Sequence, residues 1–167
     1  YDVVLEAVNK VSRISSSNLI ADNETFHKML VDGVPVEYRK NGEIVGDYVR
    51  LVDFSEEGTD NNEFLVVNQF TVIENNNNKR PDILLFINGI PMVLFELKNP
   101  ADENATIRKA YDQICTYKAT IPSLFTYNEI CVISDGLETK AGSLTAPFSR
   151  FSTWKTKDGL NEASRFE

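Results

Sequence analysis

The chain has 167 residues and a net charge of −8, from 25 acidic and 17 basic side chains. That length suffices for one domain with a buried core, and no apolar stretch approaches the roughly 18 residues of a membrane span. The acidic balance argues against a general nucleic-acid-binding protein. Cys115 and Cys131 lie within apolar patterns, which indicates buried thiols in a cytoplasmic protein rather than a disulfide framework.

The charge is distributed unevenly along the chain. Residues 1–63 contain 13 acidic and 6 basic side chains, a net charge of −7, whereas residues 64–119 contain 6 of each. A neutral region can contact phosphate once a divalent cation is bound. Tight DNA binding by itself usually rests on many contacts from Lys and Arg to phosphates. We therefore expect another component to deliver any DNA to this chain.

The N-terminal part of the chain predicts two helices. Apolar residues at helical spacing favour a helix over residues 2–14. A second, shorter helix is expected at residues 22–30, where Asp22 or Asn23 can cap the first turn.

A hairpin and an acidic loop follow these helices. Strands are predicted at residues 34–39 and 44–54, and Asn41-Gly42 between them has the chemistry of a tight turn. Residues 55–63 are acidic and contain no basic side chain. They predict a solvated loop, although the same loop would suit a basic partner.

Residues 64–74 predict one long strand. Its apolar side chains serve both faces over much of its length, as expected for a strand near the centre of a sheet. Asn68 and Gln69 are polar interruptions in this strand, and either can face a functional site. Residues 75–78 are all asparagine and predict a turn.

A second hairpin carries the strongest local signal in the chain. Two apolar runs, residues 83–87 and 90–97, flank Asn88-Gly89, and Asn-Gly between apolar runs is typical of a two-stranded hairpin. Antiparallel strands joined by a tight turn bring their far ends together. We therefore expect Asp82, which opens the first strand, to lie beside Glu96 and Lys98, which close the second.

These three charged residues indicate a metal-dependent hydrolytic site. Glu96 and Lys98 share one face of their strand because side chains alternate. Asp82 and Glu96 would repel one another unless a cation lay between them, and Mg²⁺ prefers such oxygen ligands. The lysine can stabilise charge on a reacting phosphate. The alternative is that all three residues simply mark the point where buried strands reach water.

The remainder of the chain predicts a β-α-β unit. Residues 105–118 form an amphipathic helix that should pack on the sheet, with Gln113 and Tyr117 on one face. A buried strand at residues 129–134 follows, in parallel pairing, and a further strand is expected at 137–144. Tyr117 reads equally well as a core aromatic, whereas a sheet-facing Gln113 needs a hydrogen-bond partner.

Two motifs carry a resemblance to a known superfamily. Pro81-Asp82 followed by Glu96-Leu97-Lys98 resembles the PD-(D/E)xK nucleases, and Gln113-Ile-Cys-Thr-Tyr117 resembles the QxxxY helix of one branch of them. The resemblance implies an α/β fold of the restriction-endonuclease type, with a mixed central β-sheet flanked by helices. It also implies Mg²⁺ ligands at Asp82 and Glu96 and catalytic roles for Lys98, Gln113 and Tyr117.

Longer sequence blocks narrow the resemblance to the N-terminal nuclease domain of the R (restriction and motor) subunit of type I restriction–modification enzymes. The blocks include VPVEYRKNGEIVGDYVRLVDF, NEFLVVNQFTVIE and RPDILLFINGIPMVLFELKNPADENATI. This family implies cleavage of double-stranded DNA, driven by ATP-dependent translocation in domains that this chain lacks, and assembly with modification and specificity subunits. No GxxxxGK[ST] loop is present, so ATP would bind elsewhere.

The resemblance adds three further expectations. Residues 1–154 would form the nuclease domain, and residues 155–167 a linker toward helicase-like motor domains. Lys79 and Arg80 are candidates for DNA phosphate contacts. Glu6 is either a solvated helix charge or an additional metal ligand, as supplied from an early helix in some nucleases of the superfamily.

Two other functions remain open at the level of sequence. One is a repair or recombination nuclease with the same chemistry. The other is a nuclease-like fold that serves only as a docking module.

Overall fold

The computed structural model describes residues 2–101 and 106–155. A six-stranded mixed sheet forms its centre, in the order β10-β9-β8-β7-β6-β3. Strands β7 and β8 are parallel, and the other neighbouring strands are antiparallel. The strands of this sheet are β3 (Phe64–Asn68), β6 (Ile83–Ile87), β7 (Ile90–Leu97), β8 (Ile130–Ser134), β9 (Thr139–Gly142) and β10 (Ser152–Thr153).

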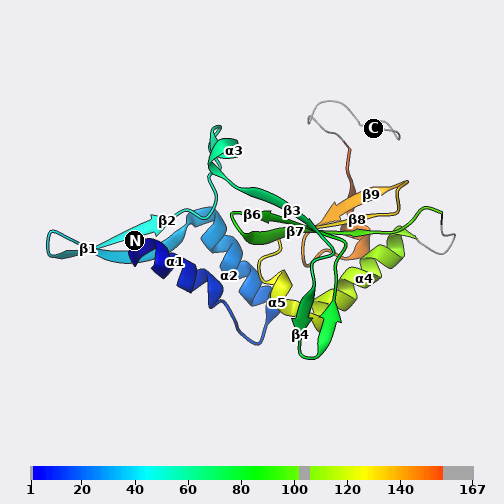
Figure 1. Cartoon of the computed structure of the whole chain (residues 1–167), viewed down its shortest axis with the longest axis horizontal. Helices are drawn as coiled ribbons and strands as arrows, with labels where there is room; N and C mark the ends of the chain where they lie inside the picture. The colour runs from blue at the N-terminus through cyan, green and yellow to red at the C-terminus, as the bar shows by residue number, and fades with distance from the viewer. Residues whose placement is uncertain (1, 102–105, 156–167) are drawn as a thin grey trace.

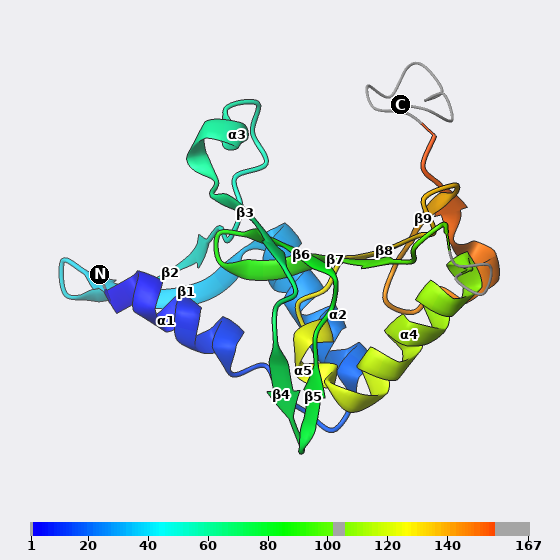
Figure 2. The same ribbon diagram turned by 45° about the vertical axis from the view of Figure 1, so that its right-hand side comes forward.

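Three helices cover one face of this sheet. Figure 2 shows α2 (Leu19–Asp32), α4 (Ile107–Thr120) and α5 (Pro122–Phe125) on the same side of strands β6, β7 and β8. Helix α4 connects β7 to its parallel neighbour β8, as the β-α-β pattern predicts. The predicted α/β fold of the restriction-endonuclease type, a mixed sheet with flanking helices, is therefore confirmed.

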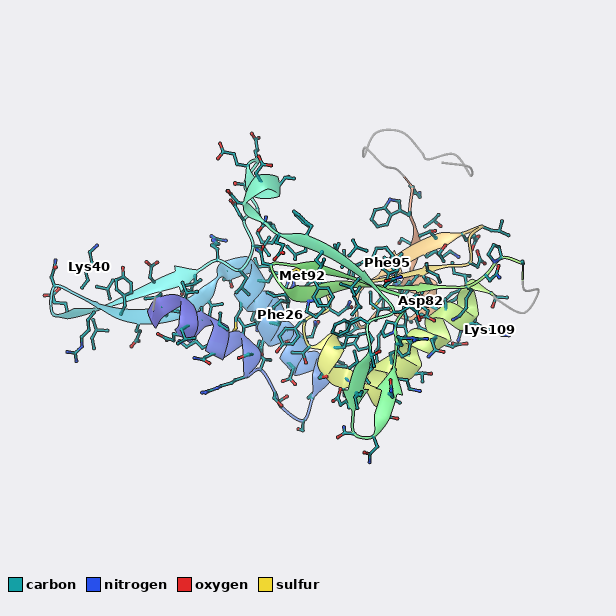
Figure 3. The ribbon with its side chains drawn as sticks, viewed as in Figure 1. Phe26, Lys40, Asp82, Met92, Phe95 and Lys109 are labelled. Atoms are coloured by element: carbon teal, nitrogen blue, oxygen red, sulfur yellow. The ribbon has the colours of Figure 1, made fainter. Side chains whose placement is uncertain are left out.

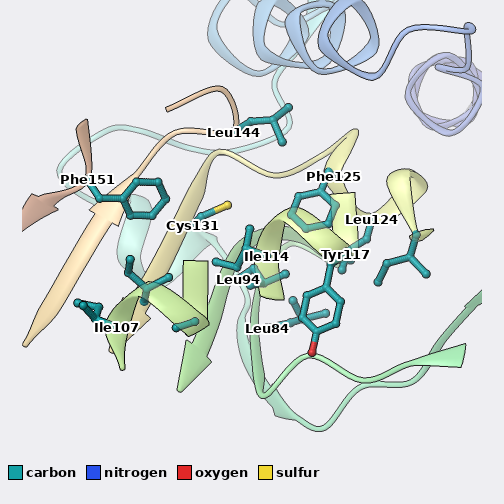
Figure 4. Packing of buried hydrophobic residues seen from close by; sticks show 13 residues of the cluster. Leu84, Leu94, Ile107, Ile114, Tyr117, Leu124, Phe125, Cys131, Leu144 and Phe151 are labelled. Atoms are coloured by element: carbon teal, nitrogen blue, oxygen red, sulfur yellow. The ribbon is translucent and has the colours of Figure 1, made fainter. Parts of the chain in front are cut away.

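The main core lies between the central strands and α4. Leu84 and Leu94 from the sheet and Ile114 from the helix are almost completely buried, and they belong to one hydrophobic cluster with Phe125 of α5 (Figure 4). Apolar spacing along α4 explains the arrangement, because Ala110, Ile114 and Tyr117 share its buried face. Cys115 lies between two of them in sequence but points outward, so the expectation of two buried thiols was wrong for Cys115 and right for Cys131.

A second hydrophobic cluster stabilises the N-terminal part of the chain. Helix α1 (Asp2–Ser12) packs on the hairpin of β1 (Val34–Lys40) and β2 (Glu43–Val49), which extends from one end of the molecule (Figure 1). The hairpin was predicted, but its second strand ends at Val49 rather than at residue 54.

Helix α2 begins earlier than predicted. The Asn18 side chain accepts hydrogen bonds from the backbone of Ile20 and Ala21 and so caps the helix. The expected cap at Asp22 or Asn23 was wrong, because the Asp22 carboxylate instead accepts a hydrogen bond from the Ser16 backbone N–H.

The predicted strand at residues 64–74 is broken. Strand β3 ends at Asn68, and Gln69 has a left-handed backbone with φ of 54°. The chain then forms a separate hairpin of β4 (Val72–Glu74) and β5 (Asn77–Lys79). Strand β3 is also an edge strand and not a central one, and Phe64, Leu65 and Val66 remain 52–65% exposed.

Smaller differences concern the loops and the chain ends. The acidic loop contains one helical turn, α3 (Gly58–Asn61). A 3₁₀ turn, η1 (Phe148–Arg150), precedes β10. None of the described helices combines the length and apolarity needed to cross a membrane. Apart from Lys155, the predicted linker at residues 155–167 lies outside the described residues.

Candidate active site

The hairpin of β6 and β7 places Asp82 at the end of the central strands. Asn88 and Gly89 form the turn with φ of 51° and 80°, and Ile83 pairs with Phe95 at the far end. One carboxylate oxygen of Asp82, Oδ2, accepts the backbone N–H of Leu97 at 2.8 Å. The predicted meeting of Asp82 with the end of β7 is therefore present, and Figure 3 shows Asp82 far from Lys40 at the tip of the β1–β2 hairpin.

Glu96 is the most buried charged residue of this group. It is 3% exposed, and its Oε1 accepts a hydrogen bond from Lys98 Nζ at 2.7 Å. No donor in the described part of the chain reaches the buried Oε2 with hydrogen-bonding geometry. Burial raises the pKa of the Glu96 carboxyl, and the charge of Asp82 raises it further, while Lys98 and Tyr117 act in the opposite direction.

Lys98 lies on the same face of the chain as Glu96, as strand alternation predicts. Its side chain is 24% exposed, and its backbone N–H donates to the carbonyl of Ser134 at 2.8 Å. The ammonium group is therefore held at the sheet end, against the Glu96 carboxylate, with one side open to solvent.

Gln113 and Tyr117 reach the same place from helix α4. Tyr117 is 6% exposed, and Figure 4 shows its hydroxyl at the margin of the apolar cluster, beyond Leu84. Burial raises the pKa of the Tyr117 hydroxyl, and the charges of Glu96 and Asp82 raise it further. The hydroxyl therefore keeps its proton at neutral pH. The Gln113 side chain lies close enough to this hydroxyl to act on it, and it lowers the pKa of Tyr117.

Lys79 and Arg80 immediately precede Pro81-Asp82. Lys79 is the last residue of β5 and is half-buried, whereas Arg80 is exposed. Neither forms a salt bridge with another described residue. Both cations are thus close to Asp82 along the chain and remain available to an anion.

Glu6 lies on α1, away from these residues. Its carboxylate pairs with Lys10 at 2.7 Å, and a backbone hydrogen bond from Glu37 of β1 also lowers its pKa. The structure therefore supports the solvated helix charge and not an additional metal ligand, because α1 packs against the β1–β2 hairpin rather than the sheet end (Figure 1).

Two donors to Asp82 complete the arrangement. Gln69 Nε2 donates to Asp82 Oδ1 at 3.0 Å, so of the two polar residues singled out in that region Gln69 is the one that faces the site. The other donor, the backbone N–H of Leu97, was missed. No side-chain pattern signals a backbone donor.

Comparison with known families agrees with this geometry. The family described as "Type I restriction enzyme R protein N terminus" matches residues 2–150. This chain belongs to that family.

Individual relatives point the same way. The chain is 46% identical over 159 residues to the type I restriction enzyme HindI endonuclease subunit of Haemophilus influenzae, covering 95% of this chain and 15% of that protein. It is 41% identical over 157 residues to the putative type I restriction enzyme MjaIXP endonuclease subunit of Methanocaldococcus jannaschii, covering 92% and 15%. The chain thus spans about 15% of the length of these relatives. These relationships support a nuclease-domain role in a restriction system.

The donor set of this R-protein N-terminal domain fits a hard divalent cation. No group of three or more His, Cys, Asp and Glu side chains in residues 2–101 and 106–155 forms a metal cluster. Asp82 and Glu96 provide two carboxylates, and Mg²⁺ usually takes one or two carboxylates and retains several waters. The buried Glu96 Oε2 without a donor is the atom that a cation would satisfy.

Proposed function

We propose that this domain cleaves phosphodiester bonds of double-stranded DNA with the help of Mg²⁺, as the nuclease domain of a type I restriction endonuclease subunit. The observation that carries the proposal is the pair of Asp82 and Glu96. A buried carboxylate oxygen without a donor is costly, and a second carboxylate beside it adds repulsion. A structural role alone gives no reason to retain this arrangement, whereas a bound cation removes both costs.

The carboxylates and the lysine have different roles in the proposed reaction. Asp82 and Glu96 hold the cation, which when bound lowers the pKa of a coordinated water and neutralises charge on the attacked phosphate. Lys98 Nζ donates to Glu96 Oε1 at 2.7 Å. From this position the Lys98 ammonium would stabilise negative charge on the attacked phosphate or orient the attacking water.

Tyr117 and Gln113 act as donors in this proposal. The raised pKa of Tyr117 excludes it as a base near neutral pH. Its hydroxyl is close enough to Glu96 to lower the pKa of that carboxyl, and we assign it to orienting the site as a neutral, protonated group. Gln113 in turn fixes the hydroxyl. Lys79 and Arg80 hold a DNA phosphate next to Asp82, an assignment that follows from their unpaired charge among the described residues.

The complete protein would supply what this domain lacks. The region of residues 64–119 has no excess of basic side chains, so the domain needs other parts to bring DNA to it. This chain covers 15% of its Haemophilus influenzae relative, and we assign the ATP-dependent translocation that the family resemblance implies to the other parts of the endonuclease subunit. Modification and specificity subunits would select the site.

The proposal is tested first by metal binding. Isothermal titration of the 167-residue chain with MgCl₂ should show saturable binding in the wild type and its loss in Asp82→Asn and Glu96→Gln. Glu6→Gln serves as a control that removes an acidic side chain from α1 and should bind Mg²⁺ as the wild type does. Equal affinity in all four proteins would overturn the proposed metal site.

Cleavage is tested in the complete endonuclease subunit with its partner subunits. Asp82→Asn and Glu96→Gln should abolish cutting of plasmid DNA, while Glu6→Gln should cut at the wild-type rate. A nuclease-like docking module is the second candidate, favoured because residues 2–101 and 106–155 contain no cluster of three or more metal-ligating side chains. That candidate predicts no Mg²⁺ binding and unchanged cutting by the two site variants.

A further inference from the structure

Gln69 contacts Asp82 twice. Its backbone N–H donates to the Asp82 carbonyl at 2.8 Å, and its side-chain amide donates to Asp82 Oδ1 at 3.0 Å. The backbone of Gln69 is left-handed, with φ of 54°, a conformation that a residue other than glycine rarely adopts. Such strain is found where the surrounding structure determines the conformation, and often at functional sites.

The Asp82 carboxylate is held from two sides. Gln69, just after edge strand β3, donates to Oδ1, and the Leu97 backbone on β7 donates to Oδ2 at 2.8 Å. Two donors from separate segments of the chain, one just after β3 and one on β7, hold the side chain in one orientation. A carboxylate has about four acceptor positions, so each oxygen keeps one lone pair available on the side away from its donor.

The β4–β5 hairpin depends on the same pair of residues. The β4–β5 hairpin lies in the segment between Gln69 and Asp82. The two hydrogen bonds from Gln69 to Asp82 join the ends of this segment where it leaves and re-enters the sheet. Its outer part is anchored on α5, because Glu74 Oε2 accepts the Ser123 backbone N–H at 3.0 Å and the Ser123 hydroxyl at 2.7 Å. Val72 packs against the main core. The position of Asp82 is therefore fixed by a braced loop and not by β6 alone.

We propose that Gln69 is a positioning residue, which orients the Asp82 carboxylate so that its free lone pairs face a divalent cation shared with Glu96. This inference rests on the proposed function. An amide is suited to the task because it is a neutral donor. A lysine or arginine at the same place would neutralise the Asp82 charge and compete with a cation, and a carboxylate would repel Asp82. The amide fixes the ligand and leaves its charge intact.

The variant Gln69→Gly separates the side chain from the backbone. Glycine accepts φ of 54° without strain, so the turn is kept while the amide is removed. We expect Gln69→Gly to weaken Mg²⁺ binding by about 10- to 100-fold, the usual effect of removing a group that orients a metal ligand. Gln69→Asn is a second variant, since asparagine tolerates the left-handed region but has a shorter side chain, and it should weaken binding likewise.

Asn68→Ala is the matched control, because Asn68 is the exposed neighbour of Gln69 at the end of β3. Mg²⁺ affinity is measured by isothermal titration of the 167-residue chain, alongside thermal melts. In the complete subunit, excess Mg²⁺ should restore most of the cutting rate of Gln69→Gly, a recovery that general damage to the fold would not give.

The outcomes distinguish this inference from the proposed function. If the wild type binds Mg²⁺ and both Gln69 variants bind it within about twofold, the positioning role is overturned and the metal site stands. If the wild type itself binds no Mg²⁺, the proposed function is overturned, and the role of Gln69 with it.

Discussion

Lys98 Nζ donates to Glu96 Oε1 at 2.7 Å, while the second oxygen of the same carboxylate is buried and accepts no hydrogen bond from the described residues. The two oxygens of the Glu96 carboxylate thus differ, since Lys98 pairs with one of them and the other is the oxygen that we propose for a cation. This asymmetry separates the site from an ordinary surface ion pair, which is exposed and contributes little.

Replacing Glu96 by glutamine should stabilise the metal-free protein. The variant removes a buried charge beside Asp82 and retains an oxygen that can accept the Lys98 hydrogen bond. We expect the free energy of unfolding to rise by about 1 kcal/mol, measured by urea denaturation in EDTA at neutral pH. A loss of stability in Glu96→Gln would show that the negative charge is satisfied in the metal-free state.

The same variant tests the pH dependence of stability. The pKa of Glu96 in the folded protein is raised above its ordinary value of 4.5, so the folded state binds this proton more tightly than the unfolded state. The contribution of Glu96 to the free energy of unfolding should therefore be largest at low pH and fall as pH rises from about 4.5 through the raised pKa. The difference between wild type and Glu96→Gln isolates it, and parallel stability profiles in EDTA would contradict the raised pKa.

Lys98→Ala should separate DNA cleavage from ATP hydrolysis. Within the complete restriction enzyme, we expect this variant to lose DNA cutting and to keep ATP hydrolysis, because the proposed mechanism uses the lysine in cleavage alone. Plasmid cleavage and phosphate release are measured on the same preparation. Continued cutting by Lys98→Ala would remove Lys98 from the mechanism.

Tyr117 contributes to both packing and the site, and two substitutions separate these contributions. Tyr117→Phe keeps the ring and removes the hydroxyl, so the free energy of unfolding should fall by about 1 kcal/mol at most while cleavage slows. Tyr117→Ala leaves a cavity at a 6% exposed position and should cost about 3–5 kcal/mol. Urea denaturation should show a larger loss of unfolding free energy in Tyr117→Ala than in Tyr117→Phe. Equal losses of unfolding free energy in the two variants would show that the ring does not pack as described.

The sequence predicted the centre of the site well because that information is local. Asn88-Gly89 marks the turn of the β6–β7 hairpin, and a register shift between Leu85 and Phe86, which was not predicted, places Ile83 opposite Phe95 and so brings Asp82 to the end of β7. Strand alternation then places Lys98 on the face of Glu96, where the structure has it. Helical spacing similarly directs Gln113 and Tyr117 toward the sheet.

The edge of the sheet was less predictable. Asn68 and Gln69 interrupt the apolar pattern of residues 64–74, but two polar residues do not specify the left-handed turn, which is stabilised by hydrogen bonds to Asp82 13 residues later. Phe64 and Val66 look like central-strand residues, but among the strands that the structure describes β3 lies at the edge of the sheet, beside β6. Pairing partners distant in sequence decide such positions, and a single strand's pattern does not contain them.

A crystal structure of the domain grown with Mn²⁺, which replaces Mg²⁺ and gives an anomalous signal, would be the most decisive observation. We predict one strong anomalous peak within bonding distance of both Asp82 and Glu96 Oε2, with Lys98 displaced from its 2.7 Å contact. A structure without a peak there at saturating Mn²⁺, and with the Lys98–Glu96 pair unchanged, would contradict the assignment of this sheet end as a metal-dependent nuclease site.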